Sequence, residues 1–530
     1  MMRKNIKYLA ILALGLVACE PEFDNPIDEA GTYASGEADF SNFVALGNSL
    51  TAGFADGALY ITGQENSYPN ILSQQFAFAG GGDFTQPLMA DNVGGFSNDP
   101  VSFPPRFVLV FDADGNPVGP ATFTGAAPST DFTTSLGSSF NNMGVPGAKS
   151  YHLAAPGYGN AAGVSAGLAN PYYARFASSA TSTVIGDAVA QNPTFFSLWI
   201  GNNDILSYAT SGGVGVDHNE VPNLDPSTYG SNDITNTTTF AGVYSQLIDG
   251  LTANGAKGVV LNLPSVTSLP FFTTVPYAPL SPLDPNFGPQ IPTLNGIYSK
   301  LNAAFTFLGV PERSIEFSAT AASAVVIKDE SLNDITANLA LVIAADPVLG
   351  PLAPIIAAQF GQARQATAED LLVLPSSRVI GQLNTDRVAE LVMLGVPQET
   401  AAQFSVSGVS LPLGDQYVLI PEEQTAIENA RVAFNATISG LATANGLAFY
   451  DVASVLEQAS SGGIRINGGT VTSTFVSGGG FSLDGVHPTP RAHALVTNGV
   501  LDAIQATYGS VLPRVDPADY GTVTLSNEVN

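Results

Sequence analysis

Short apolar runs alternate with longer amphipathic stretches along most of the chain. Four of these runs have the length of buried strands: 43–46, 195–200, 258–263 and 447–452. They are apolar at successive positions rather than at alternate ones, which is typical of strands in a parallel sheet that is covered on both faces. The pattern therefore predicts an α/β fold with a mainly parallel sheet.

Helical patterns occupy the segments between these runs. The clearest one begins at Pro421, where proline fits the first turn, and Glu422 and Glu423 follow where the helix dipole favours acidic side chains. It runs to about Thr443, before the stop signal Asn445-Gly446. Further helices are predicted at 182–191, 239–253 and from 490 to about 508.

The beginning of the chain departs from this pattern. Three basic residues precede an apolar run at 8–17, which is too short to cross a bilayer and predicts a signal peptide over residues 1–18. Its end, Leu16-Val17-Ala18-Cys19, resembles the lipobox of bacterial lipoproteins, so we expect Cys19 to be lipidated. The alternative is an ordinary signal peptide followed by an unmodified cysteine. Cys19 is the only cysteine, so the chain forms no internal disulfide.

An acidic, proline-containing stretch at 19–38 predicts a tether between this lipid and the folded domain. Acidic residues directly after a lipidated cysteine resemble the surface-export signal of some Gram-negative lipoproteins. We therefore expect an exported lipoprotein of the outer membrane, displayed on the cell surface; a plain solvated linker is the alternative. The domain is expected over 39–515, with a tail at 516–530.

Composition narrows the classes of partner. The chain has 45 acidic and 17 basic residues, a formal charge of −28. Nucleic-acid binding needs clustered Lys and Arg, so this balance argues against it, and it equally argues against attraction to anionic lipid. Only 12% of residues are charged and 45% are apolar, which is ample for a large core. Membrane attachment is therefore expected through the lipid alone.

Candidate chemistry lies near both ends of the domain. Ser49 directly follows the first predicted strand, and active sites of parallel sheets form at the carboxyl ends of strands. Asp484 and His487 directly precede the last predicted helix, at a spacing that lets a carboxylate orient an imidazole as a general base. The alternatives are structural: Ser49 as a helix cap, and Asp484 capping a turn with His487 at the surface.

These segments together resemble the SGNH, or GDSL, hydrolase family, which has its nucleophile serine in an early motif and Asp-x-x-His in the last one. Two more segments fit the family. In 142–148, Gly147 matches the glycine whose N–H joins the oxyanion hole, and in Gly201-Asn202-Asn203-Asp204, Asn203 matches the asparagine whose amide points at the oxyanion. The resemblance implies a three-layer flavodoxin-like fold. It implies a catalytic triad of Ser49, His487 and Asp484. It also implies an oxyanion hole formed by Ser49, Gly147 and Asn203.

The chain departs from the family pattern in two ways. Asn48 stands where the name-giving motif has Asp, and the spacing between the motifs exceeds what the minimal fold needs. The excess predicts two large insertions, at about 77–135 and 265–419, which we expect to determine the substrate. Apolar residues between 339 and 356 would either form a lid over an acyl chain or pack the core of their own insertion.

The resemblance implies hydrolysis of carboxylic esters through an acyl-enzyme, with no metal and no cofactor. The low charge and the lipid anchor favour acyl-lipid substrates. The alternatives are a deacetylase of acetylated carbohydrate and a surface binding protein on an inactive hydrolase scaffold. Asp112-Ala113-Asp114 has the beginning of a calcium loop but lacks the glycine and glutamate of an EF-hand, so a hairpin turn after 108–111 is predicted instead.

Overall fold

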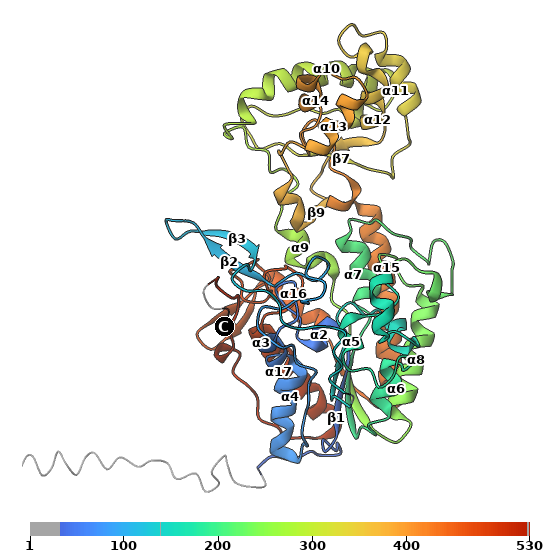
Figure 1. Ribbon diagram of the computed structural model, residues 1–530, viewed down its shortest axis with the longest axis vertical. Helices are drawn as coiled ribbons and strands as arrows, with labels where there is room; N and C mark the ends of the chain where they lie inside the picture. Colours follow the sequence, from blue (N-terminus) through green and yellow to red (C-terminus); the bar gives the residue numbers. More distant parts are fainter. Residues whose placement is uncertain (1–31, 138, 527–528, 530) are drawn as a thin grey trace, which may run out of the picture.

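The computed structural model describes residues 32–137, 139–526 and 529. The predicted signal peptide and Cys19 lie outside the described residues, as does most of the predicted tether. Figure 1 shows a larger lower part, which contains the central sheet, and a smaller part above it. We call residues 275–420, which make up this smaller part, the upper lobe.

A five-stranded parallel sheet forms the centre of the larger part. Its strands lie in the spatial order β4 (Asn142–Gly144), β1 (Phe43–Gly47), β5 (Phe195–Trp199), β6 (Lys257–Leu261) and β11 (Ala448–Tyr450). All neighbouring pairs are parallel, which confirms the predicted α/β class and places all four predicted strands. In chain order the strands run 2-1-3-4-5 across the sheet, the order of flavodoxin-like sheets.

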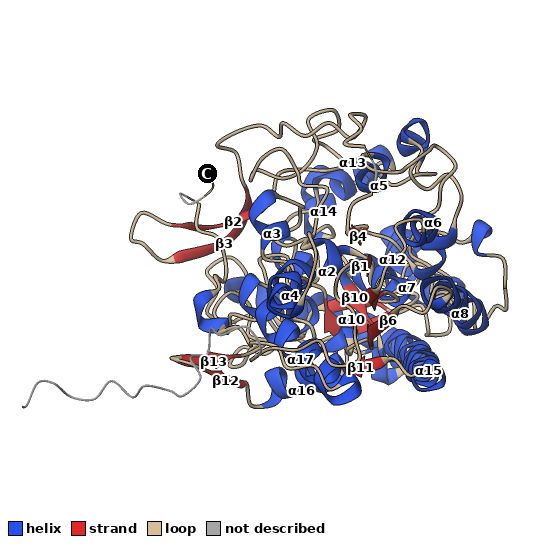
Figure 2. Ribbon diagram, turned by 90° about the horizontal axis from the view of Figure 1, so that it is seen from below, coloured by secondary structure: helices blue, strands red, loops and turns tan. Residues whose placement is uncertain are grey.

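Helices cover both faces of this sheet. Alternate residues of β1 point in opposite directions: Val44 and Leu46 belong to the core on one face, and Phe43 and Ala45 to the core on the other. Burial on both faces explains why the strands read as continuous apolar runs. Figure 2 shows the two helical layers on opposite sides of the strands: α6 (Val184–Val189), α8 (Thr237–Thr252) and α15 (Pro421–Asn445) on one side, α4 (Tyr68–Phe76) and α17 (Pro490–Tyr508) on the other.

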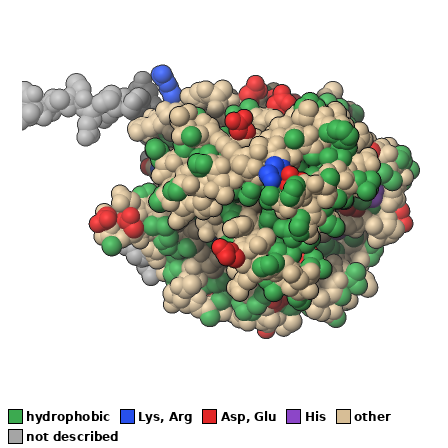
Figure 3. Space-filling view, turned by 90° about the horizontal axis from the view of Figure 1, so that it is seen from above, with side chains coloured by type: hydrophobic (Ala, Val, Ile, Leu, Met, Phe, Trp, Pro, Cys, Tyr) green, Lys and Arg blue, Asp and Glu red, His purple; other side chains and the backbone are tan. Residues whose placement is uncertain are grey.

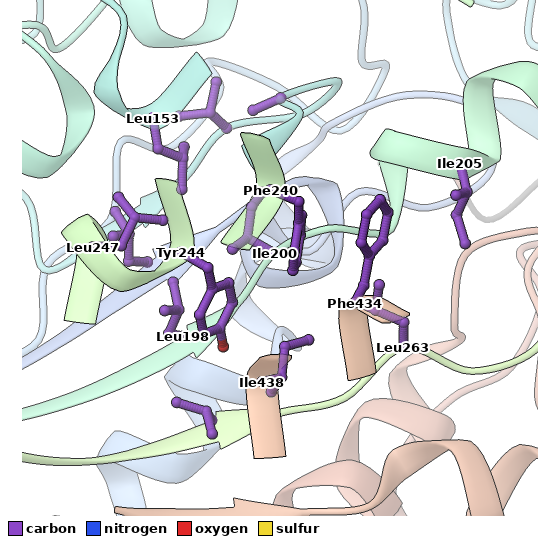
Figure 4. Packing of buried hydrophobic residues seen from close by; sticks show 14 of the residues in the cluster. Leu153, Leu198, Ile200, Ile205, Phe240, Tyr244, Leu247, Leu263, Phe434 and Ile438 are labelled. Carbon is purple, nitrogen blue, oxygen red and sulfur yellow. The ribbon is translucent and has the colours of Figure 1, made fainter. Parts of the chain in front are cut away.

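Packing on the first face is shown in Figure 4, where Phe240 and Tyr244 of α8 and Phe434 of α15 meet beside β5. The Phe240 and Phe434 rings stack with their centroids 4.0 Å apart. The predicted helix from Pro421 is α15, and it ends at Gly446 in the left-handed conformation (φ 62°), as its stop signal predicted.

The site is positioned by shorter elements that follow the strands: α2 (Ser49–Ala52), α3 (Ile61–Glu65), α5 (Pro171–Ala174), α7 (Asn203–Thr210) and α16 (Val452–Ser461). Two antiparallel hairpins lie outside the sheet: β2 (Phe107–Phe111) with β3 (Pro117–Thr122), and β12 (Ile464–Ile466) with β13 (Gly469–Val471). The hairpin predicted after 108–111 is the first of these. In its turn, Asp112 Oδ1 accepts hydrogen bonds from the backbone N–H groups of Asp114 and Asn116.

The upper lobe has a hydrophobic core of its own. Its elements are α10 (Ile291–Phe307), α11 (Thr336–Ile343), α12 (Ala353–Phe360), α13 (Thr385–Met393), α14 (Gln398–Gln403), and the strand pairs β7 (Val326–Lys328) with β8 (Ala363–Gln365) and β9 (Leu371–Leu372) with β10 (Val418–Leu419). The short helix α9 (Pro270–Thr273) precedes it. Leu339, Ile343 and Ile356 are buried in this core, whereas Leu341 is 76% exposed. Most of the apolar residues of the 339–356 segment therefore pack the lobe itself.

Charged side chains are sparse on the surface of the upper lobe. Seen from above, Figure 3 shows mostly apolar and uncharged polar side chains, with Asp and Glu in scattered groups and very little Lys or Arg. This agrees with the low share of charged residues in the sequence. Across the part of the chain that the structure describes, no helix combines the length and the apolar character needed to cross a membrane.

Both ends of the described chain contact the domain. Ala34, at the end of the predicted tether, pairs with Val511 after α17, and Ala38 is buried against the sheet. In the predicted C-terminal tail, Thr524 accepts a hydrogen bond from the N–H of Leu109, and Ser526 donates one to its carbonyl. The described ends of the tether and the tail are thus part of the packed structure.

Tyr508, the last residue of α17, joins the two strands at one edge of the sheet. Its buried hydroxyl donates to the carbonyl of Gly258 at 2.8 Å and accepts from the N–H of Ala448 at 3.2 Å. We expect Tyr508→Phe to lower the free energy of unfolding by about 1–3 kcal/mol, because buried backbone groups lose their partner. Urea unfolding measures this. Tyr277→Phe is the matched control, since the hydroxyl of Tyr277 makes no hydrogen bond within the described residues; equal losses in both variants would contradict the assignment.

Candidate active site

The structure brings the predicted triad residues together at the carboxyl edge of the sheet. Ser49 begins α2 directly after β1, and His487 lies in the loop before α17. His487 Nε2 is 2.9 Å from Ser49 Oγ, and His487 Nδ1 is 2.9 Å from Asp484 Oδ2. Only 13% of the His487 side chain and 12% of that of Asp484 are exposed, so the arrangement is largely shielded from water. The geometry is that of a nucleophile, a base and the carboxylate that orients the base.

Ser49 is held by an unusually close approach of backbone segments. A Cβ on Gly47 would lie 2.2 Å from Thr51 Oγ1, and one on Gly144 of β4 would lie 2.4 Å from the backbone nitrogen of Ala52. Glycine at both positions therefore lets α2 pack directly against β1 and β4. The serine is fixed at the point where the strand turns into the helix.

Asn48 is the N-cap of α2 and also links two of the sequence segments. Its Oδ1 accepts from the N–H of Leu50 at 3.0 Å, and its Nδ2 donates to Asn202 Oδ1 at 3.3 Å. An aspartate at position 48 would cap the helix equally well. Its carboxylate has no N–H group, however, and could not donate a hydrogen bond to Asn202 Oδ1. The Asn48 amide, which stands where the family motif has Asp, therefore has a structural role in this chain.

The predicted oxyanion donors lie on three adjacent elements. The backbone N–H groups of Ser49 and Gly147 have no acceptor within the described ranges, and Gly147 is in the left-handed region (φ 80°). Asn203, at the start of α7, donates from Nδ2 to the carbonyl of Ala148 at 2.9 Å. A primary amide carries two N–H donors, so the second remains for another acceptor. This hydrogen bond holds the Asn203 side chain against the turn that contains Gly147.

Asp204, the next residue of α7, also holds the turn that contains Gly147, through hydrogen bonds to Ser150. Its buried carboxylate accepts from the N–H of Ser150 at 2.8 Å and from the Ser150 hydroxyl at 2.6 Å. Burial raises its pKa above the usual range. Asp204 therefore has a positioning role that the sequence pattern alone did not assign to it.

The Asp484 carboxylate is fully hydrogen bonded. Oδ1 accepts from the backbone N–H groups of Val486 and His487 and from the Ser482 hydroxyl, and Oδ2 accepts from the N–H of Gly57 at 2.9 Å in addition to His487 Nδ1. Burial alone would raise its pKa, but the imidazole of His487 and these N–H groups lower it to about 2. Asp484 is therefore ionised at neutral pH, as an imidazolium partner should be.

Sequence reasoning missed a second buried carboxyl, that of Asp56, which lies behind Asp484. Its Oδ1 accepts from the N–H of Leu483 at 2.9 Å and its Oδ2 from the Tyr60 hydroxyl at 2.8 Å, while its own N–H donates to Ser482 Oγ. Asp56 also has a positive φ of 53°. Asp-Gly marks a turn in the sequence, but no sequence pattern shows that this carboxylate points inward. Its bonds join the turn after α2 to the loop that carries Asp484 and His487, which we call the triad loop.

The other described histidines do not belong to this site. His152 Nδ1 accepts from the N–H of Lys149 at 3.0 Å, its ring stacks on Tyr158, and burial lowers its pKa to about 3. The structure therefore shows His152 in a capping position. Phe54, by contrast, lies beside the triad, with its ring centroid 4.7 Å from that of His487.

One cluster of carboxylates could in principle hold a metal ion. The side chains of Glu330, Asp415 and Glu423 lie between the upper lobe and α15, with their oxygens within 4.8 Å of one another. Burial and mutual repulsion raise the pKa of Asp415 to about 7 and that of Glu423 to about 9. Asp415 and Glu423 therefore retain protons near neutral pH. No member of this cluster belongs to the Ser49–His487–Asp484 arrangement.

An apolar pocket that is partly open to solvent lies beside Ser49, Asn203 and His487. Most of its wall comes from α16, the β12–β13 hairpin, the segment after β6 and the start of α17. Of these, the sequence had indicated a functional role only for the segment after β6, as part of the second predicted insertion. The apolar stripe of α16 was the available signal. Among the elements predicted as insertions, only the segment 265–269 contributes to this wall.

Asp56 gives the folding equilibrium a specific pH dependence. Burial, assisted by the nearby charge of Asp484, raises its pKa from 3.8 to about 6. The folded state therefore binds more protons than the unfolded state between these values, so the contribution of this group is fully present below about pH 4 and is lost as pH rises through 6. Two pKa units correspond to about 3 kcal/mol. We expect the stability of wild type relative to Asp56→Asn to fall by up to about that amount between pH 4 and 7, in urea unfolding; a constant difference would contradict this.

Comparisons with known proteins give no relative for this chain. It matches no protein-family model, no curated protein and no solved structure.

Proposed function

We propose that this protein hydrolyses carboxylic esters by nucleophilic catalysis at Ser49, as a member of the SGNH hydrolases. The observation that carries the proposal is the continuous hydrogen-bonded series from Ser49 Oγ through His487 to Asp484, with both steps at 2.9 Å. The strand order and the three layers support an SGNH fold. The hairpin segment and the upper lobe would be its two insertions.

In the proposed mechanism, Ser49 Oγ attacks the ester carbonyl carbon while His487 Nε2 takes the hydroxyl proton. Asp484 fixes the tautomer of His487 and stabilises the imidazolium. The tetrahedral intermediate collapses when the carbon–oxygen bond to the alcohol breaks and His487 protonates the leaving oxygen. Water then attacks the acyl-enzyme by the same route, releasing the carboxylic acid and restoring Ser49.

Negative charge on the carbonyl oxygen requires donors that are already in place. The N–H groups of Ser49 and Gly147 and the second N–H of the Asn203 amide are proposed for this role. Asn203 is oriented by its bond to Ala148, and Asp204 holds the turn, so these donors need little reorganisation when the charge develops. No metal or cofactor is needed in this scheme.

Acyl-lipid esters are the proposed substrates, because the pocket beside Ser49 is lined mainly by apolar side chains. A carbohydrate deacetylase would place hydrogen-bonding groups around its substrate, so this alternative is less well supported. The retention of all five predicted catalytic and oxyanion residues argues against an inactive binding scaffold. Attachment to the outer membrane through Cys19, with display on the cell surface, remains part of the proposal.

Replacing the nucleophile or the base tests the proposal directly. We expect Ser49→Ala and His487→Ala each to lower kcat on p-nitrophenyl esters by about 10⁴-fold or more, with an unchanged melting temperature. Ser460→Ala, an exposed serine on α16, is the matched control and should retain wild-type rates. Near-wild-type turnover in either triad variant would overturn the mechanism.

Removing one oxyanion donor should give a smaller effect with a distinct signature. We expect Asn203→Ala to lower kcat by about 10²–10³-fold with little change in KM, because the lost interaction is made mainly in the transition state. Steady-state kinetics with a soluble p-nitrophenyl ester separates the two constants. A rise in KM with unchanged kcat would assign Asn203 to ground-state binding instead.

A further inference from the structure

The apolar pocket follows the carboxyl edge of the sheet away from Ser49. Its wall is built from the segments that leave four neighbouring strands: Ser49 and Leu50 after β1, Asn202 and Asn203 after β5, 264–269 after β6, and α16 after β11. Neighbouring strands are about 4.8 Å apart, so three steps across the sheet span about 14 Å. The pocket is therefore an elongated space that begins at the nucleophile.

Polarity changes along this space. The polar lining residues, among them Ser49, Asn203, His487 and Ser265, come from the segments after β1, β5 and β6 and from the triad loop. Toward β11, the wall consists of apolar side chains from α16 and the hairpin: Val452, Val455, Leu456, Ala459, Ile464 and Val471. None of the residues that line the pocket is an Asp, Glu, Lys or Arg. A ligand that fits has a polar reacting end and a long apolar remainder.

The wall formed by α16 is regular. Val452, Val455, Leu456 and Ala459 follow the spacing i, i+3, i+4, i+7, so they lie on one face of the helix. Figure 2 shows α16 beside α17 and next to the β12–β13 hairpin, which contributes Ile464 and Val471. An apolar helix face that borders an open pocket instead of filling it marks a binding site for an apolar group.

We propose that this pocket binds the acyl chain of a medium-chain fatty ester, about ten to twelve carbons long. The proposal rests on the proposed function, which places the ester bond at Ser49. An extended polypeptide advances about 3.5 Å for every three bonds, or about 1.2 Å per bond, so a space of about 14 Å holds roughly twelve bonds of an extended chain.

We assign the acyl chain of the ester, rather than its alcohol, to the pocket because the proposed reaction has two steps. The acyl group stays bonded to Ser49 through both steps, whereas the alcohol leaves after the first. Apolar contacts with the acyl chain therefore stabilise both transition states. The alcohol leaves on the side of His487, which protonates it.

Chain-length profiles test this assignment. On p-nitrophenyl esters from acetyl to palmitoyl, wild-type kcat/KM should rise by up to about fourfold per methylene, with a maximum at about ten to twelve carbons. Ala459→Trp should lower the decanoyl-to-acetyl ratio of kcat/KM at least tenfold, because the indole fills the pocket. Leu456→Ala should move the maximum to longer chains, a change that misfolding does not mimic.

The matched control is Gln458→Trp, which places the same side chain on the exposed face of α16 and should leave the profile unchanged. A second series, acetate esters of alcohols of increasing length, should show no such maximum. If the alcohol series instead shows the length preference and Ala459→Trp removes it, the acyl assignment is overturned while ester hydrolysis stands.

These measurements distinguish a wrong assignment of the pocket from a wrong assignment of ester hydrolysis. Hydrolysis that depends on Ser49 but is equal for all chain lengths in wild type and variants overturns the pocket assignment alone. If no ester is hydrolysed, the proposed function fails, and calorimetric binding of dodecanoate then decides the pocket: binding by wild type that is lost in Ala459→Trp and kept in Gln458→Trp supports it, and equal behaviour of the three proteins overturns it.

Discussion

The Asp484 carboxylate is the contact on which the geometry of the site depends. It accepts hydrogen bonds from its own loop and from the N–H of Gly57, a residue 427 positions earlier in the chain. Asp56 strengthens the same junction through Leu483 and Ser482. Because Gly57 follows α2 closely, these bonds fix the loop of His487 relative to the helix that begins with Ser49. Two segments far apart in the chain are thereby held so that His487 Nε2 lies 2.9 Å from Ser49 Oγ, within the hydrogen-bond reach that proton transfer needs.

The parallel sheet makes this junction possible. In the strand order β4-β1-β5-β6-β11, the connections reverse direction between β1 and β5, which is where parallel sheets open a crevice at their carboxyl edge. Ser49 follows one of these strands and Asn203 the other, so both side chains enter the same crevice. Close packing at Gly47 and Gly144 then excludes a larger residue beside the nucleophile.

The sequence was informative wherever a local pattern determined a local structure. Examples of such local patterns are the apolar runs of the strands, the limits of α15 and the short spacing between Asp484 and His487. Strand β4 was not predicted, because Asn142-Met143-Gly144 contains a single large apolar residue and does not form an apolar run. Asp56 and the pocket wall were missed for another reason: their roles arise from contacts between segments far apart in the chain. The separate core of the upper lobe shows the same limit, since apolar residues read alike whether they cover a site or fill a core.

The pocket and the triad share one loop, which in the proposed function links substrate binding to catalysis. Phe481, Val486 and Pro488 line the apolar pocket and flank Asp484 and His487 in the chain. A chain that fills the pocket packs against the same segment that carries the general base. Binding energy from the unreactive part of a substrate can then hold the base at Ser49, which increases kcat as well as affinity. In the proposed function, substrate selection thus belongs to the end of the sheet domain itself, through α16 and the loop after it, while the upper lobe has a core of its own.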